Sequence, residues 1–177
     1  MSEYCTEAIV LGRRENGGGH NLFADLYTRE LGRVEARVVS GRKITSKLSP
    51  HLDPGTLVFA RLVHKNQFTL ADTLLEERFS GVSGLQYENF SRLAHLFRYL
   101  FPFGVSDFDV WELLLKSLRE GEIAYTMFLS LLGYGREGAL CGRCSEVETR
   151  AFFLPDQTFL CGICASPFSE REVVRFI

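Results

Sequence analysis

Residues 22–39, LFADLYTRELGRVEARVV, decide the fold of the N-terminal part of this chain. Apolar residues occupy every second position, namely Leu22, Ala24, Leu26, Val34, Ala36 and Val38. A period of two is typical of β-strands that bury one face and expose the other. Residues 30–32 interrupt the alternation. The stretch therefore predicts two strands, 22–28 and 32–39, on either side of a short connection.

Three further segments, 6–11, 56–64 and 67–75, have the same β-rich composition. Breakers separate them, including the glycine run 17–19, residues 40–55 and Lys65-Asn66. Five short antiparallel strands in about seventy residues are typical of a small closed barrel such as the OB-fold. An open sheet or an SH3-like barrel is the alternative.

The apolar period then changes to that of helices. Residues 86–101 place Phe90, Leu93, Phe97 and Leu100 on one helical face. After a break at 102–104, Ser106 with Asp109 three positions on predicts a capping box for a second helix, which Gly121 ends. A third helix is expected at 122–132, ended by Gly133. The apolar faces of these two helices consist of Val110, Trp111, Leu114, Leu115, Leu118, Ile123, Met127, Phe128 and Leu131.

Two Cys-x2-Cys pairs lie near the C-terminus, Cys141/Cys144 and Cys161/Cys164, with sixteen residues between them. This spacing is that of a four-cysteine zinc site. Residues 151–160 can run out and return as two short apolar strands joined at Pro155-Asp156. We therefore predict one structural zinc ion in a ribbon at 139–166. The whole chain is predicted to be α+β, with an OB-fold barrel at 1–80 and a small helical domain at 81–177 that includes the ribbon.

Other uses of the cysteines fit less well. Two disulfides need an oxidising compartment, and a redox pair lacks a thioredoxin-like context. A zinc deaminase is disfavoured because no histidine begins His-x-Glu and neither pair follows a proline. The fifth cysteine, Cys5, is interpreted as a small buried hydrophobe.

The net charge of −2 conceals an asymmetry along the chain. Residues 1–70 hold ten Lys/Arg and seven Asp/Glu, whereas residues 71–177 hold ten and fifteen. The N-terminal part is therefore the better candidate for binding a polyanion. No N-terminal stretch resembles a signal peptide and no apolar run reaches eighteen residues, so a cytoplasmic location is expected.

A basic, hydroxyl-rich loop at 40–50, SGRKITSKLSP, is the main candidate for binding phosphate. Its cations are Arg42, Lys43 and Lys47, and its hydroxyl groups could bind phosphate without reading sequence. The candidates that extend this track are Arg33 and Arg37 on one strand face, Arg13-Arg14 before the glycine run, and Tyr27, Phe59 and Phe68 as base-stacking rings. The alternative is a solvated basic turn with the aromatic rings in the core.

The first helix carries Arg92, His95 and Arg98 on its polar side. This stripe is either solvated or a surface for an acidic peptide. The chain has no Gly-x-Ser-x-Gly elbow, no His-x-x-x-His pair and no P-loop ending to its glycine run, so no enzymatic activity is predicted.

The order of these parts resembles the RecO family of bacterial recombination mediators. The resemblance is carried by residues 7–11, residues 22–54, Phe101-Pro102, and Leu131–Tyr134 leading into the cysteines. Typical members continue with more helix after the ribbon, so this chain is expected to have a short helical domain.

The resemblance implies an OB barrel, a helical domain and a zinc ribbon in a nucleoid-associated protein of the bacterial cytoplasm. It implies binding and annealing of single-stranded DNA, and help in replacing single-stranded DNA-binding protein by RecA, usually together with RecR. It also implies capture of the acidic tail of single-stranded DNA-binding protein, for which Arg92, His95 and Arg98 are the candidate residues. The alternative function is a zinc-ribbon interaction scaffold whose barrel binds protein instead of DNA.

Overall fold

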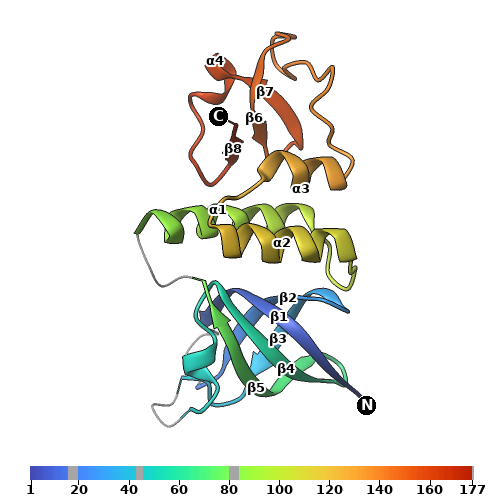
Figure 1. Ribbon diagram of the computed structural model, residues 1–177, viewed down its shortest axis with the longest axis vertical. Helices are drawn as coiled ribbons and strands as arrows, with labels where there is room; N and C mark the ends of the chain where they lie inside the picture. The colour runs from blue at the N-terminus through green and yellow to red at the C-terminus, as the bar shows by residue number, and fades with distance from the viewer. Residues whose placement is uncertain (16–19, 43–45, 80–83, 177) are drawn as a thin grey trace. The chain divides into compact units, whose positions relative to one another are not determined.

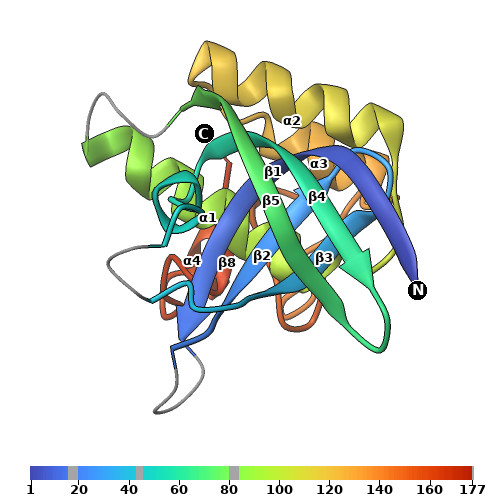
Figure 2. The ribbon, with the colours of Figure 1, turned by 90° about the horizontal axis from the view of Figure 1, so that it is seen from below.

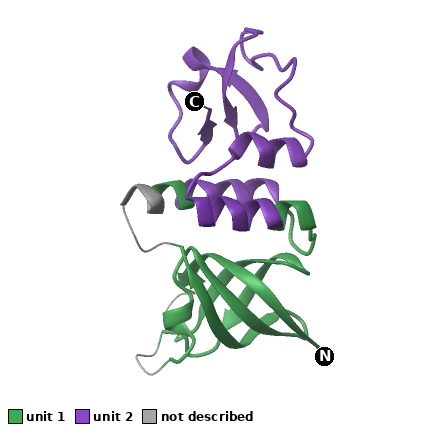
Figure 3. Cartoon of the chain, in the orientation of Figure 1, with its two compact units in different colours: residues 1–90, 102–111 green, residues 91–101, 112–177 purple. Residues whose placement is uncertain are grey.

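The computed structural model describes residues 1–15, 20–42, 46–79 and 84–176 of the 177-residue chain. The chain divides into two compact units, 1–90 with 102–111, and 91–101 with 112–177 (Figure 3). The division passes through helices α1 (Gly84–Leu100) and α2 (Phe108–Glu120), so both helices contribute to both units. The boundary expected between residues 80 and 81 lies outside the described residues.

The first unit holds a closed five-stranded barrel (Figure 1). Its strands are β1 (Ser2–Glu15), β2 (Leu22–Thr28), β3 (Gly32–Val38), β4 (Thr56–His64) and β5 (Phe68–Arg78), with a short 3-10 helix η1 (Ser49–His51) before β4. The strand order is β1-β2-β3-β5-β4, and β4 pairs with β1 to close the ring. All neighbours are antiparallel except β3 and β5. The chain is thus α+β with an OB-fold-like N-terminal barrel, and the open sheet is excluded.

Strand β1 is longer than predicted because it serves two neighbours in turn. Its first half pairs with β4 over Ser2–Ile9, and its second half pairs with β2 over Ala8–Glu15. The register shifts between Val10 and Gly12, which lets the strand bend around the barrel. Figure 2 shows β1, β4 and β5 crossing in front of β2 and β3.

The barrel core confirms the alternation of residues 22–39. All six apolar residues of that pattern are buried, together with Ala8, Val10, Leu52, Val58, Ala60, Leu62 and Leu70. Cys5 contradicts its interpretation as a buried hydrophobe because it is exposed. Thr6, Ala8 and Val10 take the inward positions of β1, so Cys5 falls on the outward phase opposite Arg61 of β4.

The second helix begins one residue later than the predicted capping box. The side chain of Asp107, and not that of Ser106, accepts a hydrogen bond from the Val110 N–H at 3.1 Å. Ser106 belongs to a segment that lies against the β2–β3 turn, since its N atom is 2.8 Å from where a Cβ on Gly32 would stand. The N-cap role therefore falls to the next polar residue.

The third helix, α3 (Tyr125–Leu131), is shorter than the predicted 122–132 and buries only part of the predicted apolar face. Phe128 and Leu129 are buried, whereas Met127 and Leu131 are exposed. Phe128 packs edge-on against Phe97, with ring centroids 5.5 Å apart, and this contact sets which side of α3 points inward. Gly133 has a φ of +86° just after the helix, which confirms its predicted role at the C-terminus.

The cysteine-rich segment folds as a ribbon around strands β6 (Thr149–Phe153) and β7 (Thr158–Cys161). They pair antiparallel across residues 154–157, which confirms the predicted hairpin at Pro155-Asp156. A third strand that was not predicted, β8 (Val173–Arg175), pairs with β6. The short helix α4 (Gly162–Ala165) carries the last cysteine.

Candidate nucleic-acid interface and metal centre

A hollow of about 720 Å³ opens where β1 ends and β2 begins. Three arginines line it, Arg13 and Arg14 from β1 and Arg42 from the loop after β3. Its other lining residues are Glu15, Leu22, Gly41, Ser46, Ser49, Pro50 and Asp53. The predicted basic loop and the predicted Arg13-Arg14 pair, far apart in the sequence, therefore meet at one site.

Backbone contacts hold Arg42 at this site. Its N–H donates to the His20 carbonyl at 3.0 Å, and the Ser40 N–H donates to the side chain of Asn21 at 3.0 Å. Gly41 lies so close to β2 that a Cβ there would stand 2.7 Å from Leu22 Cγ. The loop thus runs tightly along the start of β2, which brings the Arg42 guanidinium to the end of β1.

Carboxylates share the hollow with the arginines. Glu15 lies 3.1 Å from Arg42, and Asp53 lies 3.4 Å from both Arg13 and Arg78. These contacts are partly exposed ion pairs, of the kind that contributes little to stability. The site is therefore a basic hollow whose cations lie next to acidic groups.

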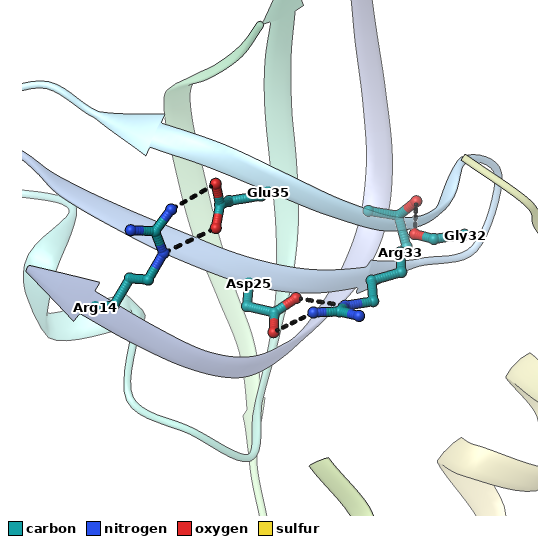
Figure 4. A network of polar contacts seen from close by, with 6 residues as sticks. Arg14, Asp25, Gly32, Arg33 and Glu35 are labelled. Atoms are coloured by element: carbon teal, nitrogen blue, oxygen red, sulfur yellow. Dashed lines mark hydrogen bonds and ion pairs between the residues drawn. The ribbon is translucent and has the colours of Figure 1, made fainter. Parts of the chain in front are cut away.

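The outer face of β1, β2 and β3 continues the basic surface. Strand register places Arg14, Phe23 and Arg37 side by side across the three strands. The Arg14 guanidinium lies over the Phe23 ring, 4.7 Å from its centroid. Arg14 is also bound by both oxygens of Glu35 at 2.9 Å (Figure 4). The row combines an aromatic ring with two guanidinium groups, which are the residue types that stack bases and hold phosphates in single-strand sites.

Phe23 was missed as a stacking candidate, although the alternation placed it on the outer face. Tyr27 was named instead, and it is buried because its ring stacks on Trp111 at 6.4 Å. Burial also raises the pKa of Tyr27. Phe68 is half-buried between Tyr4 and His64, and Phe59 is exposed on β4. What would have identified Phe23 is its position between Arg14 and Arg37, which depends on strand pairing and cannot be read from the sequence alone.

Arg33 is held in the structure by its own contacts. Its guanidinium donates to both oxygens of Asp25 at 3.0 and 3.2 Å (Figure 4). The Phe103 ring covers the guanidinium, with its centroid 4.3 Å away. The side chain is only 12% exposed. Arg33 is therefore not available as one of the predicted phosphate-binding cations. Lys47 is exposed near the hollow, and Lys43 lies outside the described residues.

The four paired cysteines converge on one point. The Sγ atoms of Cys141, Cys144, Cys161 and Cys164 all lie within 4.8 Å of one another. A tetrahedral zinc with Zn–S bonds of about 2.3 Å needs sulfurs roughly 3.8 Å apart, and Cys144 and Cys161 are 3.6 Å apart. Bonded sulfurs would be about 2.05 Å apart, and all five cysteines are free. The disulfide alternative is therefore not seen, and the cluster can hold a metal ion.

The electrostatics of the cluster suit a cation. Burial raises the pKa of the Cys141 thiol, but hydrogen bonds from the backbone of Cys161, Arg143 and Cys144 outweigh it and lower that pKa to about 6. Hydrogen bonding to Cys144 raises the pKa of Cys164 to about 12. One thiolate beside protonated thiols is a cluster that a metal ion would deprotonate fully.

The helix stripe is less cationic than predicted. Arg92 forms an ion pair with Glu170 at 3.3 Å. Burial, and then the charges of Arg98 and Arg171, lower the pKa of His95, so its imidazole is neutral at pH 7. Arg98 is exposed at the end of α1. The stripe is therefore less basic than its sequence suggests, because His95 is neutral and Arg92 contacts Glu170.

Comparison with known proteins places the N-terminal part of the chain in a family. Residues 1–74 match the family described as "Recombination protein O N terminal". A search of curated proteins finds no match. Among the described residues, no helix is long and apolar enough to cross a membrane. Residues 1–74 therefore carry a RecO N-terminal domain, which links this part of the chain to DNA recombination and repair.

Proposed function

We propose that the chain binds and anneals single-stranded DNA as a recombination mediator, without enzymatic activity of its own. The observation that carries the proposal is the hollow of Arg13, Arg14 and Arg42 beside the row of Arg14, Phe23 and Arg37. The hollow supplies guanidinium groups for phosphates, and the row supplies a ring for a base. The match of residues 1–74 to the RecO N-terminal domain supports the same assignment.

The arrangement favours single strands over duplex DNA. Base stacking on Phe23 requires an unstacked base, which a single strand presents and a duplex does not. The arginines of the hollow would bind phosphates, and phosphate contacts do not distinguish one base sequence from another. We therefore expect sequence-tolerant binding whose affinity depends strongly on salt.

The loop cations are expected to set part of that salt dependence. Each phosphate contact contributes a slope of roughly −0.7 in log K against log salt on single strands. Replacing Arg42 and Lys47 together by alanine should flatten the slope by about 1.4 and leave the fold intact. Fluorescence anisotropy of a labelled oligothymidylate over a salt series measures this change.

The matched control removes two charges from another part of the barrel. The double variant Arg61→Ala with Lys65→Ala removes the same number of positive charges from β4 and the turn after it. Its salt-dependence slope should stay close to that of the parent protein. Equal binding by both double variants would place the DNA elsewhere. A parent protein that binds no oligonucleotide at low salt would favour the scaffold, in which the barrel binds protein.

We propose that the ion in the four-cysteine cluster is zinc and that its role is structural. All four positions are protein thiolates, so none is left open for a substrate or a water. The ligands come from the loop before β6 and from the end of β7 with α4. The ion would therefore tie the two ends of the β6–β7 hairpin together.

We propose that the mediator acts together with single-stranded DNA-binding protein and RecR, and acts on RecA indirectly. The acidic tail of single-stranded DNA-binding protein requires a cation beside an apolar surface. Because His95 is neutral, the positive charge of the stripe comes from Arg92 and Arg98, and tail binding should depend on both.

Arg98→Glu is expected to weaken binding of a tail peptide at least tenfold, because it turns an attraction into a repulsion. Lys116→Glu, an exposed charge reversal on α2, serves as the control and should change little. Calorimetric titration of the peptide into each protein tests both. A peptide that binds the Arg98 variant as tightly as the parent would show that the tail surface lies elsewhere.

A further inference from the structure

We infer that Glu15 and Asp53 are built-in competitors of the DNA phosphates, which keep the affinity of the hollow for single strands low. The inference rests on the proposed function and concerns the regulation of the same site. Glu15 lies 3.1 Å from Arg42, and Asp53 lies 3.4 Å from Arg13. All three arginines that line the hollow are therefore already in contact with an anion of this chain, since Arg14 is bound by Glu35.

These two ion pairs differ from the structural pairs on the neighbouring face. Arg14–Glu35 and Arg33–Asp25 are bidentate, with donor–acceptor distances of 2.9 to 3.2 Å. The side chains of Glu15 and Asp53 are 67% and 46% exposed, so both carboxylates can reach solvent. They are therefore free to turn into solvent when another anion arrives.

A carboxylate and a phosphate offer a guanidinium the same pair of oxygen atoms. Glu15 lies against one terminal guanidinium nitrogen of Arg42, so a phosphate that binds this nitrogen has to displace Glu15. The displaced carboxylates remain close to the phosphates and repel them. Each contact made by DNA is thus offset by one that the protein loses, which makes binding weaker and more easily reversed.

The test replaces the charge and keeps the shape. Glu15→Gln should raise the affinity for a labelled oligothymidylate about three- to fivefold at fixed salt, and Glu15→Gln with Asp53→Asn about tenfold. The matched control is Glu30→Gln, an exposed carboxylate in the turn at the far end of β2 from the hollow. It removes the same charge and should leave the affinity unchanged.

A double-mutant cycle separates local competition from general charge. In an Arg42→Gln background the gain from Glu15→Gln should disappear, because the competitor no longer has its arginine. The inference is overturned if Glu15→Gln binds DNA equally or more weakly, which would mean that Glu15 orients Arg42 for binding. That result leaves the proposed function standing, whereas failure of the parent and all variants to bind DNA would remove both.

Discussion

Replacing Cys161 by serine is expected to abolish metal binding by the four-cysteine cluster and to unfold the ribbon. Cys161 is buried at the end of β7, and its sulfur also accepts a hydrogen bond from the Cys164 N–H at 3.4 Å as the N-cap of α4. The change therefore removes a metal ligand and a helix cap together. Structural zinc contributes about 10–16 kcal/mol to the folding of zinc-finger peptides, which is more than a ribbon core of this size can replace.

Metal analysis of the purified protein should give one ion per chain for the parent and well under one for the variant. Limited proteolysis should then cut the variant within residues 139–176 before it cuts the barrel. Cys5→Ser is the control, because Cys5 is exposed on β1 and is not one of the four clustered cysteines. A parent protein that contains almost no metal, without prior chelation, would refute the assignment.

Replacing Gly32 by alanine is expected to destabilise the first unit by roughly 2–4 kcal/mol, a large effect for one methyl group. Gly32 has a φ of +63°, which side-chain-bearing residues adopt with strain. A Cβ would also stand 1.8 Å from the Val105 carbonyl oxygen. The segment around Val105 would have to leave the β2–β3 turn, breaking the Gly104 N–H bond to the Arg33 carbonyl at 2.9 Å.

Gly104→Ala is the matched control for this prediction. Gly104 has a similar φ of +76°, but a Cβ there would meet no atom within 4 Å. Replacing Gly104 by alanine should lower the free energy of unfolding only by the backbone strain, about 1 kcal/mol. Denaturant unfolding of both variants measures the difference, which isolates the steric term. Equal stability of the two variants would show that the segment adjusts to the extra atom without loss.

Local sequence pattern was enough to predict the strands of the barrel and the four cysteines that cluster in the ribbon. Alternation is a property of successive residues, so it identified the inward side chains of β2 and β3 before any partner strand was known. The Cys-x2-Cys spacing is equally local, because each turn by itself aims two sulfurs at one point. The hairpin between the pairs follows from apolar runs on either side of Pro155-Asp156.

The errors occurred where a contact between distant residues decided the outcome. Trp111 buries Tyr27 at an outward position of β2. Phe97 turns α3 so that Phe128 points inward and Met127 outward. Ser106 lies against Gly32 of the β2–β3 turn, and the N-terminus of α2 is capped by Asp107 instead. In each case the partner lies far along the chain, so periodicity carried no information about it.

The sequence by itself determined which residues are cationic, which are apolar at strand spacing and which can bind metal. Only the tertiary structure decided which of these cations share a site and which are already paired. The strand register brings Arg14, Phe23 and Arg37 together, and it directs Arg33 onto Asp25 instead. The physical reason is that charge and hydropathy belong to single residues, whereas the neighbours that pair, bury or expose a side chain are set by the closure of the barrel.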